Sequence, residues 1–380
     1  MTRPFSDVAS VNLPRACALP DTPPSAVLAC EDRRNLHVGV FFDGTDNDKD
    51  RDKPKGEHTN VARLWQLYVN RSGTDTIRAK LYLPGVGSGT DAKVAAELEE
   101  YKSPTDKSSA THWGKLLGSL PGKAAGTGAK DRLNAAYAWV QAQCQRVSAD
   151  KEKRVDVYGF SRGAAIARTF VNLVNGALKG SAENLEVRFV GIFDTVESFG
   201  KEGALINCYL APGDAQQIVH FTAMHEHRSH FPLTTGPNDT AYVGVHSDVG
   251  GGYPPLDKDN KANHIAFIPL ADMHEASRNE GVQMDNLSRL NELSDNDIEQ
   301  VRKEVQEFKQ PVLSEPGTTP KKPFVDKYIH DSTSLAPWNW STWHYQREEI
   351  IPEKKALSKG KEPPDFSWDE SQAAAAGGAS

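Results

Sequence analysis

One segment of the chain restricts its fold more than any other. An apolar run over 155–158 is followed at once by Gly159-Phe160-Ser161-Arg162-Gly163 and then by an alanine-rich stretch over 164–178. The first run predicts a buried strand, and the last stretch predicts a helix. The pentapeptide between them matches the G-x-S-x-G turn of α/β-hydrolases, in which both glycines are needed because a side chain would clash with the neighbouring strand and helix.

The rest of the chain repeats this alternation of strand and helix. Apolar β-rich runs predict four further strands, over 36–42, 80–83, 187–193 and 241–245. Apolar residues at helical spacing predict helices over 59–68, 129–147, 268–281 and 294–309. Strands that alternate with helices predict an α/β fold, here α/β-hydrolase-like, with a mostly parallel sheet and helices on both faces.

The 380 residues are enough for one large domain with an insertion. We expect this domain over 35–345. An irregular, proline-rich arm over 1–34 precedes it, and a polar, partly disordered tail over 346–380 follows it. Residues 88–127 are rich in Gly, Ala, Lys and Ser with only local apolar clusters, so we interpret them as an insertion or lid segment.

Five residues come directly after predicted strands or in the turns that end them. They are Asp43, Gly87, Ser161, Asp194 and His246. In open α/β sheets, ligands bind beyond the carboxyl ends of the strands. The sequence therefore predicts a site at this edge of the sheet.

A serine nucleophile needs a base, and the base needs a carboxylate that orients it. In the α/β-hydrolase fold the chain order is serine, acid, histidine. Ser161, Asp194 and His246 supply that order and are the predicted catalytic residues. Asp248 is an alternative acid, although it more simply caps a turn, and His330 is the second candidate for the base.

The oxyanion hole of this fold uses the N–H after the nucleophile, here that of Arg162, and one from an earlier strand–helix loop. Counting strands backwards places that loop at Gly44 and Thr45. The alternatives are that these two residues only form a tight, helix-capping turn, or that Gly85 and Gly87 line the hole instead.

No motif calls for a cofactor or a metal ion. The two histidines within 225–228 lie too close together for a zinc site with no third ligand nearby, and we interpret this cluster as a surface or supporting segment. The acidic segment 46–57 nearly matches a calcium loop, but Arg51 stands where glycine is required. A solvated loop is the simpler interpretation, and the sequence leaves calcium binding open.

Charge and hydropathy exclude several classes of function. The formal net charge is −7, and no basic region fits nucleic acid or anchors the protein on anionic lipid. No stretch approaches 18 apolar residues, and the N-terminus does not resemble a secretory signal. Four cysteines without a CxxC pair indicate reduced thiols in a protein made in the cytoplasm.

Six ordered motifs also point to a known family. They are Phe-Phe-Asp-Gly-Thr at 41–45, Thr-Asn-Val at 59–61, Pro-Gly-Val-Gly at 84–87, Gly-Phe-Ser-Arg-Gly-Ala at 159–164, Gly-Ile-Phe-Asp-Thr-Val at 191–196 and Gly-Val-His-Ser-Asp-Val-Gly-Gly-Gly-Tyr at 244–253. From about residue 36 to 280 the chain closely resembles the DUF2235 α/β-hydrolase family, which includes the Tle1 group of type VI secretion lipase effectors. It departs from the pattern where His225-Glu226 replaces the usual Asp-Glu pair, and it lacks a long C-terminal membrane-binding region.

The resemblance implies a phospholipase of A1 or A2 type with Ser161, Asp194 and His246 as its triad. It further implies delivery by the type VI system into the periplasm of a rival bacterium, a spike or tube protein as carrier, and a cognate immunity protein. The alternatives are a soluble-ester hydrolase and a catalytically silent binding module on the same fold.

An enzyme that acts on a bilayer needs an apolar entrance and usually a mobile lid. The best candidate for contact with substrate is the cluster of Trp113, Leu116 and Leu117 in the insertion, where Gly and Ser allow hinging. The alternative is an insertion helix packed on the core.

Overall fold

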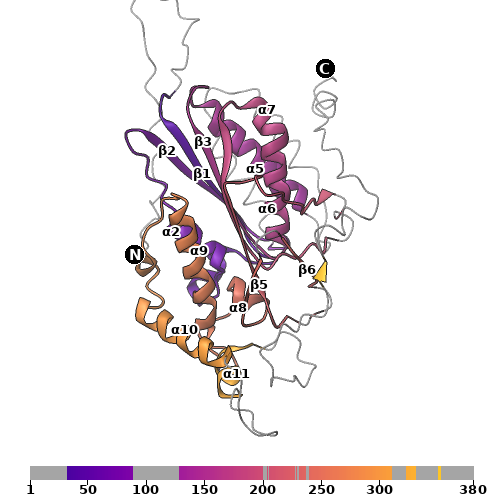
Figure 1. The fold of residues 1–380 in the computed structure, drawn as a ribbon, viewed down its shortest axis with the longest axis vertical. Helices are drawn as coiled ribbons and strands as arrows, with labels where there is room; N and C mark the ends of the chain where they lie inside the picture. Colours follow the sequence, from indigo (N-terminus) through magenta and orange to yellow (C-terminus); the bar gives the residue numbers. More distant parts are fainter. Residues whose placement is uncertain are drawn as a thin grey trace, which may run out of the picture.

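The computed structural model describes residues 32–88, 128–199, 203, 205–226, 228, 231–236, 239–309, 322–330 and 350–351. Within these residues, six parallel strands form one sheet in the order β2-β1-β3-β4-β5-β7 (Figure 1). The strands are β1 (Asn35–Phe42), β2 (Thr76–Leu83), β3 (Lys153–Phe160), β4 (Leu185–Phe193), β5 (Gln217–Ala223) and β7 (Asp239–Tyr242). A separate short pair joins β6 (Leu233–Thr234) to β8 (Ile350–Ile351).

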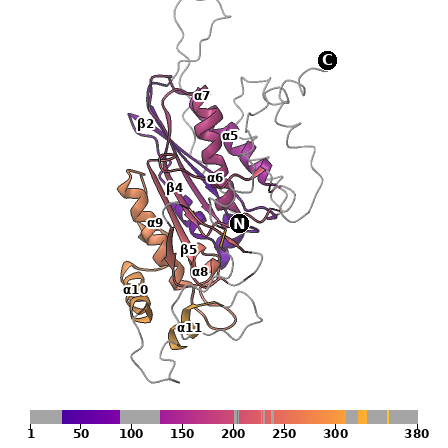
Figure 2. The same cartoon turned by 45° about the vertical axis from the view of Figure 1, so that its right-hand side comes forward.

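Helices cover both faces of the sheet, as the alternation in the sequence predicts (Figures 1 and 2). One face carries α5 (Ala129–Gln145), α6 (Arg162–Leu173), the π-helical turn η2 (Val174–Leu178) and α7 (Lys179–Ser181). The other carries α2 (Asn60–Leu67) and α9 (Phe267–Asn279), with α10 (Asp295–Lys309) beside α9. The remaining elements are α1 (Lys49–Asp52), η1 (Lys53–Lys55), α8 (His246–Gly250), η4 (Asn263–Ala266), η5 (Leu287–Leu290) and α11 (Lys322–Tyr328).

The strand register aligns the carboxyl ends of the central strands. Phe42 at the end of β1 pairs with Gly159 of β3, and Phe160 pairs with Phe193 at the end of β4. The residues that follow these strands therefore emerge at one edge of the sheet. Figure 1 shows α8, which begins at His246, beyond the same edge.

The predicted strands are all present, and the short pair of β6 and β8 is an addition that the sequence did not predict. The main sheet shows two further differences. The first is β5, which the sequence did not predict. The second is β7, expected over 241–245 but found two residues earlier and ending at Tyr242. Gly244 has a φ of +122°, which breaks the extended chain, and the N–H of Val245 then bonds to the side chain of Asp248 at the start of α8.

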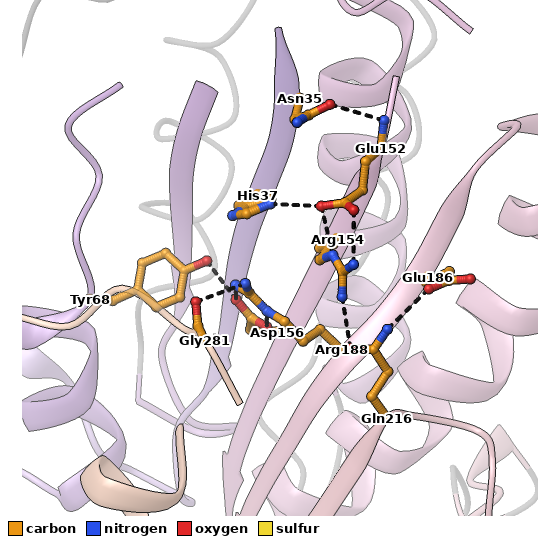
Figure 3. A network of polar contacts seen from close by, with 10 residues as sticks. All are labelled: Asn35, His37, Tyr68, Glu152, Arg154, Asp156, Glu186, Arg188, Gln216 and Gly281. Carbon is orange, nitrogen blue, oxygen red and sulfur yellow. Dashed lines mark hydrogen bonds and ion pairs between the residues drawn. The ribbon is translucent and has the colours of Figure 1, made fainter. Parts of the chain in front are cut away.

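A buried ion pair joins the middle of the sheet to the helices (Figure 3). The guanidinium of Arg188 on β4 donates to both carboxylate oxygens of Asp156 on β3, at 2.9 and 2.7 Å. The hydroxyl of Tyr68, just after α2, donates to the same carboxylate, and Arg188 also donates to the carbonyl of Gly281, after α9. Both charges of this ion pair are thus paired and hydrogen-bonded, as burial in a low-dielectric core requires.

The acidic segment 46–57 contains α1 and η1. Asp48 caps α1 by accepting from the N–H groups of Asp50 and Arg51, and Asp52 pairs with Arg51. Within the described residues, no cluster of three metal-ligating side chains is found, and no helix could cross a membrane. Cys144 and Cys208 are buried, and neither forms a disulfide with another described residue.

Candidate active site

Ser161 occupies the sharp turn between β3 and α6. Its φ of 59° and ψ of −127° lie in a region that costs a non-glycine residue about 1–3 kcal/mol. The flanking glycines make this turn possible. A Cβ on Gly159 would lie 2.7 Å from the Cα of Ala164, and one on Gly163 would overlap the carbonyl of Asp43. The serine therefore projects from a strained turn packed directly against the loop after β1.

Asp194 follows β4 and is fully buried, with a φ of 39°. Its backbone N–H donates to the carbonyl of Phe221 at 2.7 Å, and its Oδ1 accepts from the N–H of Ala223 at 2.8 Å. Its Oδ2 lies 2.5 Å from Nδ1 of His246. Burial lowers the pKa of His246, and the Asp194 carboxylate opposes that shift. Asp194 can therefore hold the neutral imidazole of His246 in one orientation through Nδ1, which leaves the other ring nitrogen, Nε2, without a bond to Asp194.

The serine turn lies beside this pair. The N–H of Ser161 donates to the carbonyl of Phe193, the residue before Asp194, at 3.0 Å. The ring of Phe160, the residue before the serine, packs on the imidazole of His246 with centroids 4.6 Å apart. The three predicted catalytic residues are thus brought to one place by β3, β4 and α8.

The loop after β1 packs on the serine turn. The ring of Phe160 would be 2.6 Å from a Cβ on Gly44. The side chain of Arg162 donates from Nε to the hydroxyl of Thr45 at 2.5 Å. A Cβ on Gly85 would overlap the carbonyl of Gly44, so the turn after β2 lies behind this loop. Gly44, Thr45 and Arg162 therefore lie together beside the serine turn.

Asp43 fixes the shape of that loop. Its carboxylate accepts from the N–H of Gly44 and the hydroxyl of Thr59, both at 2.7 Å, and from the hydroxyl of Tyr82. Burial raises the pKa of this carboxyl to about 6, against the lowering effect of its hydrogen bonds. Thr59 and Tyr82 tie the loop to the start of α2 and to β2. The N–H of Gly44, a predicted oxyanion donor, is donated to Asp43 instead.

His330 and Asp248, the alternative base and acid, pair with each other. Nδ1 of His330 lies 2.6 Å from Oδ1 of Asp248, whose other oxygen accepts from the N–H of Val245 at 3.0 Å. The His330 ring stacks on Tyr253, with centroids 3.8 Å apart, and its Nε2 is 3.6 Å from Asp257. This second pair fastens the segment after α11 to the start of α8.

Glu226, in the segment 225–228 that we interpreted as a surface or supporting segment, contacts the proposed base directly. Glu226 is buried, and its carboxylate lies 3.3 Å from the backbone nitrogen of His246. Phe231 packs edge-on against the His246 ring, with centroids 4.9 Å apart. The only signal in the sequence is a carboxylate two residues before an arginine, just after a strand, and many surface loops contain the same pair.

The predicted lid residues Trp113, Leu116 and Leu117 lie outside the described residues. Among the described tryptophans, Trp65 makes cation–π contacts with Lys49 and Lys80, whose ammonium groups lie 4.9 and 4.4 Å from its ring centroid.

A parallel α/β sheet with a strained serine turn beside a buried Asp–His pair defines the α/β-hydrolase class. Within it, the chain belongs to the Tle1-like phospholipase effector family of the type VI secretion system. The model of the catalytic domain of that family matches residues 37–180 and 176–276.

Solved structures share the fold. An uncharacterized protein from Pseudomonas aeruginosa aligns with a TM-score of 0.52 and 21% identity, over 73% of this chain and 51% of that protein, so this chain spans about half of its length. A Tle1 effector bound to the VgrG spike of a type VI secretion system aligns with a TM-score of 0.52 and 18% identity, over 79% of this chain and 84% of the effector. No curated protein matches the sequence.

Proposed function

We propose that this chain is a serine esterase that hydrolyses acyl esters of glycerophospholipids, as a phospholipase A1 or A2. The observation that carries the proposal is the 2.5 Å contact between Asp194 and His246, buried beside a serine in a strained turn. Membership of the Tle1-like phospholipase family supports the choice of substrate.

In the first half of the reaction, His246 Nε2 accepts the proton of Ser161 while Oγ attacks the acyl carbonyl. Asp194 holds the Nδ1–H tautomer and stabilises the imidazolium that forms. The N–H groups of Arg162 and Thr45 stabilise the oxyanion, because the N–H of Gly44 is already donated to Asp43. The imidazolium then protonates the lysophospholipid oxygen, which leaves as the alcohol and an acyl-serine remains.

In the second half, His246 takes a proton from water, and the resulting hydroxide attacks the acyl-serine. The same N–H groups stabilise the second oxyanion. When this intermediate collapses, the proton returns to Ser161 and the fatty acid is released. One ester bond is broken per turnover, and one water molecule is consumed.

Delivery follows from the family. We propose that a type VI spike or tube protein carries the chain into the periplasm of a target cell, where phospholipid is the substrate. The producing cell would then need a cognate immunity protein. The Tle1 effector whose fold this chain shares was solved bound to a VgrG spike, which supports a spike as the carrier. Trp113, Leu116 and Leu117 remain the proposed contacts with lipid.

The test uses the full chain with vesicles of phosphatidylethanolamine and phosphatidylglycerol whose two acyl chains differ. Released fatty acid and lysolipid are identified by mass spectrometry, and the chain that is released gives A1 or A2 specificity. Ser161→Ala should abolish release, because it removes the proposed nucleophile. The fold should be kept, because only one hydroxyl is lost. Ser277→Ala is the matched control, because it removes a different buried hydroxyl, one that accepts from Tyr158 within the core.

Three outcomes separate the alternatives. Hydrolysis of a soluble short-chain ester without release from vesicles would indicate a soluble-ester hydrolase. No hydrolysis, and no labelling of folded protein by a fluorophosphonate probe, would indicate a binding module. Equal activity of the Ser161→Ala variant and the unmodified chain would overturn the serine mechanism.

A further inference from the structure

Glu226 lies just after β5 and reaches the backbone of the proposed base. Its side chain is fully buried, and its Oε2 accepts from the N–H of His246 at 3.3 Å. Arg228 holds this carboxylate through three donors. They are its own N–H at 2.8 Å, Nε at 3.0 Å and a terminal guanidinium nitrogen at 2.9 Å. Two of these donors form the forked contact that gives a carboxylate a fixed orientation.

Aromatic rings hold the imidazole of His246 from two directions. Phe160 packs on it with centroids 4.6 Å apart and planes 33° apart, whereas Phe231 meets it edge-on at 4.9 Å and 76°. The guanidinium of Arg228 in turn stacks over Phe231, with its central carbon 3.5 Å from the ring centroid. Arg228 therefore orients both the carboxylate and the phenyl ring that contact His246.

Three charged groups act on the imidazole from the elements around it. Asp194 follows β4, whereas Glu226 and Arg228 follow β5. Burial lowers the pKa of His246. Among the charged groups, the Asp194 carboxylate raises it, the Arg228 guanidinium lowers it and the Glu226 carboxylate raises it. Asp194 contacts Nδ1 directly, so its role as the orienting acid is already taken. Glu226 contributes negative charge and a backbone hydrogen bond without contacting the ring nitrogens.

We propose that Glu226, Arg228 and Phe231 form a clamp that positions His246 and sets the pH range over which it acts as a base. These are positioning residues, because they act through His246 and not on substrate. The inference rests on the proposed function, since it assumes that His246 is the base for Ser161. Within the clamp, Glu226 stabilises the imidazolium and Arg228 limits that stabilisation.

The test measures the rate at which a fluorophosphonate labels Ser161 between pH 4.5 and 9, which requires no knowledge of the natural lipid. In Glu226→Gln the negative charge is lost while Arg228 remains, so the imidazolium becomes less stable. The acid limb is the part of this pH profile in which the labelling rate falls as His246 becomes protonated. It should move to lower pH by about half a unit or more. Glu226→Asp restores the charge and should move the limb back toward that of the unmodified chain.

Phe231→Ala removes a contact but no charge. Its labelling rate at pH 8 should fall about tenfold, because a displaced imidazole meets the serine less often in a reactive geometry. The acid limb should not move. These opposite signatures separate the electrostatic and the packing parts of the clamp.

Asp156→Asn is the matched control. Asp156 is also a buried carboxylate with a forked arginine partner, but it lies five residues before Ser161 on β3, about 16 Å away along an extended strand. It should lower thermal stability and leave the acid limb in place. An unchanged limb in Glu226→Gln, or an equal shift in Asp156→Asn, would overturn the clamp. Absence of labelling in the unmodified chain would instead contradict the proposed function.

Discussion

Two buried histidine–aspartate pairs meet at the short helix α8, which supplies the histidine of one and the aspartate of the other. In the first, Nδ1 of His246 contacts Asp194 at 2.5 Å, and in the second, Nδ1 of His330 contacts Asp248 at 2.6 Å. The pairs are nearly identical in chemistry and geometry, yet their surroundings differ. His246 lies beside the strained turn of Ser161, whereas His330 is stacked on Tyr253 with its Nε2 toward Asp257.

A histidine–aspartate pair is therefore not in itself a catalytic unit. The second ring nitrogen decides its role, because a base must present that nitrogen to a nucleophile. His246 lies beside the turn of Ser161, the proposed nucleophile, whereas Nε2 of His330 lies toward a second carboxylate. We therefore expect the first pair to serve chemistry and the second to serve stability.

The largest expected difference lies in activity. His246→Gln should slow hydrolysis of a soluble short-chain ester about 10³–10⁴-fold, as loss of a triad member does. His330→Gln should keep the rate within about tenfold. Both variants are assayed with p-nitrophenyl butyrate after circular dichroism confirms the fold. A larger loss of activity in His330→Gln than in His246→Gln would assign the role of base to His330.

The second expected difference lies in stability. Asp248→Asn should lower the free energy of unfolding by about 3 kcal/mol, because it breaks a buried pair and weakens the bond to the N–H of Val245. Urea denaturation measures this loss. Asp194→Asn serves as the reference and should instead lose activity about 10⁴-fold. A stability loss under about 1 kcal/mol in Asp248→Asn would show that this pair does not fasten α8.

The third expected difference lies in the pH dependence of hydrolysis. Protonated His246 cannot accept a proton, and burial lowers the pKa of His246 below 6.5. Activity should therefore be constant near pH 7 and fall about tenfold per pH unit once the pH is below that lowered pKa. The rate of short-chain ester hydrolysis gives this profile. An acid limb above pH 6.5 would show that burial does not dominate the ionisation of the base.

The smallest expected effect comes from the ring that stacks on His330. Tyr253→Leu keeps an apolar side chain but removes the stacked contact, so it should cost about 1 kcal/mol of stability. Differential scanning calorimetry measures the change, and ester hydrolysis should remain unaltered. A marked fall in hydrolysis would connect the second pair to the chemistry.

Much of the fold could be predicted because its strands are short apolar runs that end at polar residues. The exception, β5, contains His220 in its centre, which interrupts the apolar pattern. That histidine is buried because its Nδ1 contacts Asp239 at 2.6 Å and its Nε2 accepts from the N–H of Thr195. The partners of such a residue come from distant segments, so the sequence around it gives no sign that it can be buried.

The same limit applies to the site. Ser161 could be located because its turn requires two glycines at fixed positions, and Asp194 and His246 because each follows a strand or turn. Glu226 could not, because a glutamate before an arginine is typical of solvent-exposed loops. Its burial depends on Arg228, Phe231 and the N–H of His246, which only the folded chain brings together.

The close approach of Gly163 to the carbonyl of Asp43 also bears on how the molecule could adapt to different lipids. The start of α6 cannot shift toward β1, and any movement of one carries the other with it. We therefore expect the proposed nucleophile, Ser161, and the proposed oxyanion donors to behave as a single rigid block. In the proposed lipase, we then expect selection among acyl chains of different length to arise from side chains at the periphery of that block.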